Sequence, residues 1–159
     1  MADVVLSSGH GPRPYRSAFG QSPIFSALEV GGSTFRAGNL LEQGTTTNSH
    51  RVKFMSTNST TIVGIAGAPA SSVQDTVFPV YEANPSVEFV AAVKEVIAST
   101  LVGARRSWAY DSTLGIHYID QNATGASVVL TGLVSDIGST NGFVTFRFLA
   151  VGVAPRFGF

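Results

Sequence analysis

The 159-residue chain contains no cysteine. It therefore cannot form disulfides, and it has neither thiolate metal ligands nor a thiol nucleophile. A chain of this length can bury a hydrophobic core without covalent cross-links. No segment approaches the roughly 20 apolar residues of a transmembrane helix, and residues 1–6 lack the basic and long apolar regions of a secretory signal. We therefore expect neither membrane insertion nor secretion.

Charged residues are also scarce. They make up 13% of the chain, and ten basic residues balance ten acidic ones, whereas an average soluble domain has about 25% charged residues. A nucleic-acid-binding protein needs a basic face, so nucleic acid is not expected as a partner. A neutral surface provides little repulsion between molecules, which suits a chain that works inside an assembly.

The residues that carry most enzyme chemistry are few and scattered. The three histidines, His10, His50 and His117, are far apart in the sequence and are expected at the surface or in turns. Asp111 and Asp120 flank a predicted hairpin and could approach each other as paired carboxylates do, but aspartate is also favoured in turns for its side-chain hydrogen bonds. No nucleotide-binding loop or serine-nucleophile motif occurs. We therefore predict that the protein is not an enzyme and needs no cofactor or metal.

The abundant residues favour β-structure. Valine, isoleucine, threonine and phenylalanine dominate, 17 glycines punctuate the chain, and turn signals recur about every eight to twelve residues. This pattern predicts an all-β fold, either a small antiparallel barrel or a sandwich. The Asn141-Gly142 pair predicts a hairpin, and residues 143–149 alternate as a strand should. Residues 90–98 fit a strand and a short helix equally well.

Residues 77–83 are predicted to form a short strand that contains Pro79. Because proline has no N–H to donate to a neighbouring strand, this strand is expected to lie at a sheet edge or to begin at the proline.

Two flanking segments differ from the central β region at residues 28–150. Residues 1–27 are rich in glycine, proline and serine, which predicts an extended N-terminal arm. Residues 151–159 form a short aromatic tail. Each segment either packs back on its own domain or inserts into a partner. The candidate protein-interaction residues are Arg13, Tyr15, Arg16, Phe19, Ile24, Phe25, Arg156, Phe157 and Phe159.

Four stretches of residues 28–149 resemble one known family in their order along the chain. They are Phe35-Arg36-Ala37-Gly38-Asn39-Leu40-Leu41, Ile62-Val63-Gly64-Ile65-Ala66-Gly67-Ala68, Val77-Phe78-Pro79-Val80-Tyr81-Glu82 and Val87-Glu88-Phe89. This order resembles the decoration, or cement, proteins of tailed-bacteriophage heads.

The resemblance implies a compact β-tulip or barrel domain that assembles into a homotrimer on the outer face of the capsid. It implies an N-terminal arm that pairs with strands of the major capsid protein and clamps neighbouring subunits together. The protein would be made in the host cytoplasm and reside on the virion. Neither a reaction nor a cofactor is implied.

Two other classes of function fit the sequence. One is another phage assembly component, such as a tail-tube, head-completion or fibre protein. The other is a ligand-binding or carbohydrate-binding β module, which would present tryptophan and tyrosine on an open face. The chain has one tryptophan, Trp108, and four tyrosines, and we expect Trp108 to pack in the core.

Overall fold

The computed structural model describes residues 6–7, 10–17, 23–56, 59 and 61–150. Within these ranges the protein is all-β, with two five-stranded sheets and one two-stranded hairpin, and every pairing between strands is antiparallel. Two 3₁₀ turns, η1 (Thr46–Asn48) and η2 (Ser99–Leu101), are the helical elements of the described chain. None of the described residues forms a helix with the length and hydropathy needed to cross a membrane.

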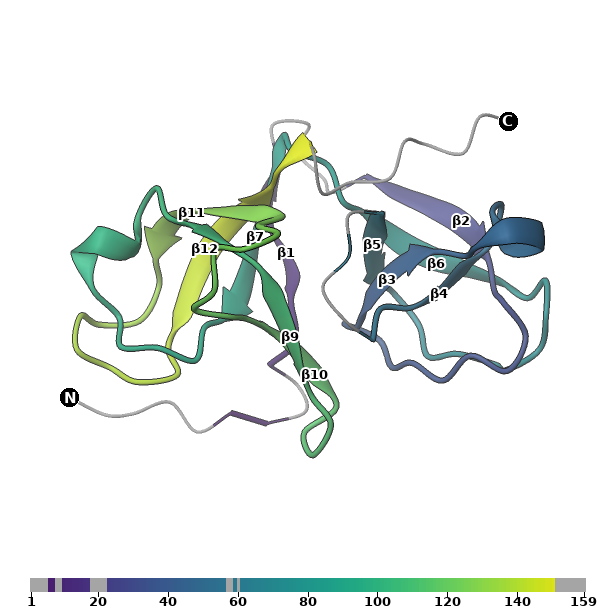
Figure 1. Cartoon of the computed structure of the whole chain (residues 1–159), viewed down its shortest axis with the longest axis horizontal. Coiled ribbons are helices and arrows are strands. Elements are labelled where there is room, and N and C mark those ends of the chain that lie inside the picture. The colour runs from purple at the N-terminus through teal and green to yellow at the C-terminus, as the bar shows by residue number, and fades with distance from the viewer. Residues whose placement is uncertain (1–5, 8–9, 18–22, 57–58, 60, 151–159) are drawn as a thin grey trace.

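One sheet, which we call sheet A, lies on one side of the molecule (Figure 1). The chain connects its strands out of sequence order, and the N-terminal strand β1 is outermost. The strands, in order across the sheet, are β1 (Arg13–Ser17), β7 (Val87–Ala92), β12 (Phe143–Phe148), β11 (Val128–Leu133) and β8 (Arg105–Arg106).

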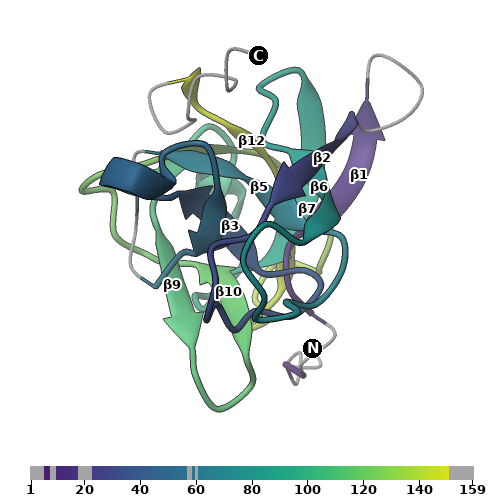
Figure 2. The same cartoon turned by 90° about the vertical axis from the view of Figure 1, so that its right-hand side faces the viewer.

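The other five-stranded sheet, sheet B, lies on the opposite side of the molecule and faces the viewer in Figure 2. Its two outer strands approach each other at one end, where Glu29 bridges to Val52 and the N–H of Val30 donates to the carbonyl of Val52 over 3.0 Å. The sheet is therefore curled. Its strands, in order, are β2 (Ile24–Leu28), β6 (Val77–Glu82), β5 (Ile62–Ala66), β3 (Leu40–Gln43) and β4 (Val52–Phe54).

The two-stranded hairpin consists of β9 (Trp108–Asp111) and β10 (Ile116–Ile119). Its turn ends at Gly115, whose φ of 72° lies in the left-handed region that glycine adopts without strain. Figure 1 shows the hairpin between the two larger sheets.

Two hydrophobic clusters hold these layers together. The larger cluster joins sheet A to the outer face of curled sheet B, because Leu40, Ile62 and Ile65 of sheet B pack in it with Phe89 and Phe146 of sheet A. Burying one such phenylalanine contributes roughly 2 kcal/mol. The smaller cluster fills the inside of the curl of sheet B and comprises Ala27, Phe35, Leu41, Val52, Val63, Ala66, Phe78 and Val80.

The all-β prediction is confirmed, with a sandwich-like packing of sheets. The hairpin predicted at Asn141-Gly142 joins β11 to β12, and the φ of Asn141 is 53°. The predicted apolar face of β12 is confirmed, since Val144, Phe146 and Phe148 are all buried, although Thr145 on the other face is buried too. Within residues 90–98, the first three belong to strand β7, and no helix forms there.

The prediction that Pro79 marks an edge strand is wrong, because β6 lies between β2 and β5. Pro79 is opposite Ser26 on β2, in a pair that exchanges no hydrogen bonds. The backbone nitrogen and carbonyl of Pro79 instead face β5. There β5 has ended at Ala66, and the carbonyl of Pro79 accepts a hydrogen bond from the N–H of Gly67. The missing proline N–H therefore breaks no ladder bond.

The described part of the predicted N-terminal arm is not separate from the β region. Residues 13–17 form β1 of sheet A, and residues 24–28 form β2 of sheet B. These segments therefore pack back on their own chain, which is one of the two alternatives that the sequence left open. The physical reason is that each pairs its backbone with an existing sheet edge, and β2 also adds Ala27 and Phe25 to the core inside sheet B.

Candidate interaction surface

Strand β1 carries the first group of predicted interaction residues. Arg13 and Tyr15 are exposed, Tyr15 by 54%, and the backbone of Arg16 pairs with Glu88 of β7. Phe143 of β12 lies on the same face of sheet A as Arg13, with β7 between the two strands. The guanidinium carbon of Arg13 is 5.6 Å from the centre of the Phe143 ring, and the His10 ring meets the same phenylalanine edge-on at 5.0 Å.

We call His10, Arg13 and Phe143, together with the exposed Tyr15 on the same strand as Arg13, the β1 surface. It combines arginine, tyrosine and phenylalanine, which are enriched in protein–protein interfaces. The sequence analysis did not identify His10 or Phe143 as members, because their approach depends on the pairing of β1 and β12 with opposite sides of β7.

Strand β2 carries the second predicted group. Ile24 is 57% exposed, whereas Phe25 is half-buried and packs against the cluster inside sheet B. The two side chains point to opposite faces, as neighbours on a strand do. The structure therefore separates Ile24, which is available for contact, from Phe25, which belongs to the core.

The exposed face of β2 continues onto β6. In the register of these strands, Ile24 is opposite Tyr81 and Leu28 is opposite Val77. Val77 is 62% exposed and Pro79 between them is also exposed. We call this apolar surface, made of Ile24, Leu28, Val77 and Pro79, the β2–β6 face.

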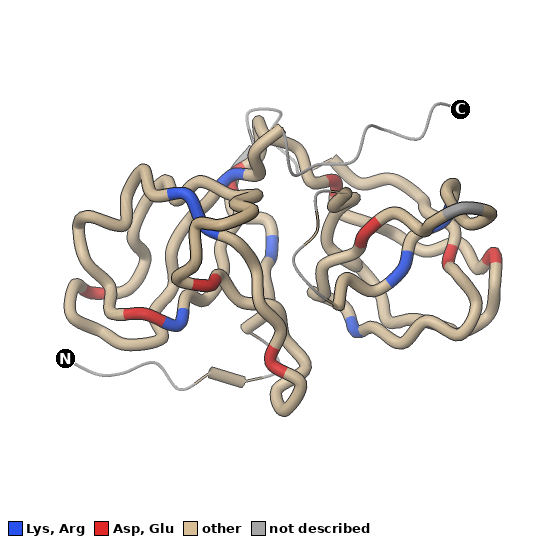
Figure 3. Tube along the Cα trace, viewed as in Figure 1, with Lys and Arg blue, Asp and Glu red and all other residues tan. Residues whose placement is uncertain are grey.

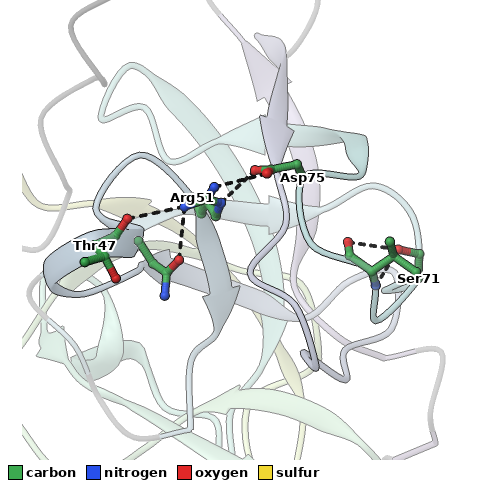
Figure 4. A network of polar contacts seen from close by, with 6 residues as sticks. Thr47, Arg51, Ser71 and Asp75 are labelled. Atoms are coloured by element: carbon green, nitrogen blue, oxygen red, sulfur yellow. Dashed lines mark hydrogen bonds and ion pairs between the residues drawn. The ribbon is translucent and has the colours of Figure 1, made fainter.

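Polar contacts hold together the loops at one end of sheet B. The side chain of Arg51 donates to both carboxylate oxygens of Asp75, at 2.7 and 3.1 Å, and to Asn48 Oδ1 and the Thr47 carbonyl in η1 (Figure 4). The hydrogen bond from Arg51 holds the pKa of Asp75 below its usual value. This network ties η1 to the loop before β6.

The buried carboxylate of Glu29 anchors that same loop. Its Oε2 accepts from the N–H and the hydroxyl of Ser71, and its Oε1 accepts from the N–H of Ser72 over 2.7 Å. The Ser71 hydroxyl also accepts from the N–H of Val73 over 3.1 Å, in the same loop (Figure 4). Glu29 and Arg51 thus have structural partners, and both fix the end of β2.

The prediction that His117 lies at the surface or in a turn is wrong. His117 is 1% exposed and lies where the β9–β10 hairpin packs on sheet B. Its Nδ1 accepts from the N–H of Leu40 at 3.1 Å, so its Nε2–H donates to the carbonyl of Met55 at 2.7 Å. Burial lowers the pKa of His117 from 6.5 to about 4. We call the two hydrogen bonds of His117, together with the bond from Asn39 Nδ2 to the Gly115 carbonyl, the seam.

Asp111 and Asp120 do not form a carboxylate pair. Asp111 pairs with Ile116 at the turn end of the hairpin, whereas Asp120 follows the other end of β10. Asp111 accepts from the N–H groups of Thr113 and Leu114, as expected for a turn aspartate, and from Lys94 Nζ at 2.6 Å. The Lys94 hydrogen bond is the main cause that lowers the pKa of Asp111. No three His, Asp or Glu residues converge as metal ligands within the described ranges.

A cavity of about 320 Å³ lies beside the seam. Its lining is mostly polar and is formed by Thr34, Phe35, Arg36, Asn39, Ala70, Ser72 and Tyr110. Trp108 does not contribute to it, because Trp108 is buried against Phe146 in the main core, as the sequence predicted.

Basic and acidic residues are interspersed over the described chain (Figure 3). Strand β2 carries none of either kind. The remaining predicted interaction residues, Phe19, Arg156, Phe157 and Phe159, lie outside the described residues.

No protein-family model matches the chain, and no curated protein sequence matches it. The interpretation of its surfaces therefore rests on their chemistry.

Proposed function

We propose that this protein is a structural component of a tailed-phage virion that attaches to the outer surface of the capsid and holds neighbouring capsid subunits together. The observation that carries the proposal is the exposed β1 surface, in which Arg13 and Tyr15 stand on the outermost strand of sheet A. The sequence resemblance supplies the identity of the partner, the major capsid protein.

The chemistry of the β1 surface suits attachment to another protein. Tyrosine and arginine dominate the energetic centres of interfaces, because each buries a large area and also makes directional polar contacts. The ring of Phe143, half-buried beneath Arg13, offers an apolar base that a partner side chain can cover. We expect truncation of either Arg13 or Tyr15 to weaken capsid binding by about 10-fold or more.

The balanced charge of the chain supports the same proposal. A protein that is packed at high density on a shell benefits from weak repulsion between its copies. The expected homotrimer is consistent with placement at threefold positions of a capsid, and light scattering of the purified protein measures its mass directly.

The test is to mix the purified protein with expanded, undecorated heads of tailed phages. Co-sedimentation and electron microscopy should reveal bound copies at regular positions, and decorated heads should resist heating better than bare ones. The Arg13→Ala/Tyr15→Ala variant should bind weakly. Arg105→Ala, which changes an exposed arginine at the other outer strand of sheet A, should bind as the unmodified protein does. Failure to bind heads that accept other decoration proteins would contradict the proposal.

A second candidate is the ligand-binding β module, which the polar cavity beside the seam favours. Arg36, Tyr110 and the hydroxyls of Thr34 and Ser72 could together hold a small polar ligand such as a sugar. Titration with monosaccharides and disaccharides, followed by NMR, tests this function. Two results together would favour the ligand-binding module over the capsid protein. The NMR chemical shifts should change saturably with sugar and stay unchanged in Tyr110→Ala, and the unmodified protein should not bind heads.

A further inference from the structure

The polar cavity beside the seam is lined by three segments of the chain. Two are loops of sheet B, which precede β3 and β6, and the third is strand β9, which contributes Tyr110. The N–H of Ala70 donates to the Phe35 carbonyl over 2.9 Å, and the hydroxyl of Ser72 donates to the Ser33 carbonyl over 2.9 Å, so the two loops are joined. The cavity volume of about 320 Å³ is at the lower end of the roughly 300–1,000 Å³ of small-ligand sites. This size suits a monosaccharide.

Arg36 gives the cavity its charge. Among the cavity-lining residues of the described chain, Arg36 alone is charged. Its backbone is fixed in a turn with Asn39, whose N–H donates to the Arg36 carbonyl over 3.1 Å and whose Oδ1 accepts from the Arg36 N–H over 2.9 Å. Its guanidinium, in contrast, forms neither a hydrogen bond nor an ion pair with the residues that the structure describes. The N–H donors of the guanidinium are therefore available to a ligand.

The two acidic residues that adjoin the lining, Glu29 and Asp111, already have partners. Glu29 accepts from the N–H of Ser72 and from the neighbouring serine in the loop before β6. Asp111 accepts from Lys94 Nζ and from two N–H groups of its own turn. Neither carboxylate belongs to the cavity lining. An anion that enters the cavity therefore meets Arg36 without a competing carboxylate.

Gly115 in the hairpin turn leaves room for the Arg36 side chain. A Cβ at this position would lie 2.8 Å from Arg36 Nη1 and 3.1 Å from Arg36 Cζ, so any other residue at position 115 would push the guanidinium away. The carbonyl of Gly115 also accepts from Asn39 Nδ2 over 2.9 Å, which ties the hairpin to the loop that carries Arg36. The seam therefore fixes both the backbone and the guanidinium of Arg36.

Two other lining residues favour a ligand that also carries hydroxyl groups. Ser72 donates its hydroxyl hydrogen to the Ser33 carbonyl, so its oxygen can only accept from a ligand. The ring of Tyr110 packs against those of Phe54 and His117, with ring centres 4.8 and 5.0 Å away. The Tyr110 hydroxyl forms no hydrogen bond within the described chain. A sugar hydroxyl, which both donates and accepts, can pair with either residue.

We propose that the cavity binds an acidic monosaccharide of the hexuronic acid class, with the sugar carboxylate on the guanidinium of Arg36. Arginine presents two parallel N–H donors that match the two oxygens of a carboxylate, and this charged pairing is stronger than a neutral hydrogen bond. The sugar hydroxyls pair with Ser72 and Tyr110. The proposal rests on the second candidate function, the ligand-binding module, and it does not involve the β1 surface.

Two matched pairs of sugars test the proposal, namely galacturonate with galactose and glucuronate with glucose. Within each pair the sugars differ only where one has a carboxylate and the other a hydroxymethyl group. Titration of the full chain, followed by NMR, gives a Kd for each sugar. We expect at least one acidic sugar to bind about 5-fold more tightly, or more, than its neutral counterpart, and added salt should reduce this difference. Acetate, which has a carboxylate but no hydroxyl, should bind more weakly than that acidic sugar.

Substitutions of Arg36 test its role, because this exposed side chain is not part of the core. Arg36→Gln should lower the affinity for the acidic sugar to that for the neutral one. Arg36→Lys keeps the charge but not the paired donors, so it should retain part of the preference. Arg105→Gln is the matched control, because Arg105 is exposed on β8 and does not line the cavity. It should bind all sugars as the unmodified protein does, and circular dichroism should show that every variant is folded.

The outcomes separate this proposal from the functions on which it does and does not depend. Equal affinity for acidic and neutral sugars would overturn the acidic specificity and leave the ligand-binding module standing. A preference for the acidic sugar that persists in Arg36→Gln would overturn the assignment of the site. Acetate that binds as tightly as the acidic sugar would overturn the sugar in favour of a simple carboxylate. Absence of binding by every probe would overturn both the proposal and the module, whereas the mixing experiment with phage heads tests capsid attachment separately.

Discussion

Leu40 and His117, 77 positions apart in the sequence, are joined by a buried hydrogen bond from the Leu40 N–H to His117 Nδ1 at 3.1 Å. Leu40 opens β3 of sheet B, and His117 lies in β10 of the hairpin. The opposite nitrogen of the same ring donates to the carbonyl of Met55. One neutral imidazole therefore binds the backbone of Leu40 in sheet B and of Met55 just after β4, and it holds both against the hairpin.

The free energy of unfolding should depend on pH through His117. Its folded-state pKa is about 4, below its usual value of 6.5, so between these values the unfolded chain binds a proton that the folded chain does not. Stability is then fully present above pH 6.5 and falls as the pH drops toward 4, by about 3 kcal/mol in total. Urea denaturation at half-unit pH intervals measures this slope.

Replacing His117 with phenylalanine should lower the free energy of unfolding at pH 7 by about 2–4 kcal/mol, because the buried Leu40 N–H and Met55 C=O lose their partners. The variant should also lose most of the pH dependence between 4 and 6.5. His10→Phe is the control for removing a histidine, and it should keep that dependence. An unchanged pH profile in His117→Phe would contradict the role of the imidazole at the seam.

Gly64→Ala should severely destabilise the protein. A Cβ at this position in β5 would collide with the carbonyl oxygen of Tyr81 and stand 2.7 Å from Val80 Cγ1. Both obstacles belong to β6, so the two strands would have to separate, at a cost of about 1–3 kcal/mol or more. Thermal unfolding followed by circular dichroism measures the loss. Gly32→Asn, in open space with a φ of 77°, should change stability little, since asparagine tolerates that conformation.

Phe146→Ala should cost about 3–5 kcal/mol of stability. Phe146 is fully buried, and its ring centre is 5.1 Å from that of Trp108 and 5.4 Å from that of Phe148. The near-ultraviolet circular dichroism of Trp108 should weaken in parallel. Val102→Ala, at a half-exposed position, should remain within about 0.5 kcal/mol of the unmodified protein. Equal stability of both variants would show that this aromatic group is not the centre of the core.

Asp111→Ala should lower stability by about 1–2 kcal/mol, because it removes two turn hydrogen bonds and the ion pair with Lys94. Asp111→Asn retains an oxygen for the turn and should cost less. Adding salt should reduce the difference between the unmodified protein and Asp111→Asn, since salt screens the ion pair. A difference that does not respond to salt would assign the effect to the turn alone.

Much of the local structure could be predicted from short-range patterns. The alternation in residues 143–149 identified β12 and its buried face, and Asn141-Gly142 identified the hairpin that leads into it. These features depend on the two-residue period of a strand and on the backbone freedom of turn residues. The same reasoning identified the burial of Trp108 and the turn role of Asp111.

The candidate site was predicted only in part. Tyr15 and Ile24 are exposed, as an interaction surface requires, but Phe25 faces the interior of sheet B. Segments 13–17 and 24–28 contribute one strand to each five-stranded sheet, and glycine and proline content alone could not distinguish such strands from a free arm. Their pairing with β7 and β6 depends on residues 49 to 77 positions away.

By itself, the sequence determined that the chain is all-β, where several of its turns fall and that Val144, Phe146 and Phe148 of β12 face inward, because these properties depend on neighbours in the chain. Only the tertiary structure decided the order of strands in each sheet, the interior position of Pro79 and the burial of His117 between Leu40 and Met55. Each of these depends on which distant backbone groups face one another, and composition and periodicity do not encode that pairing.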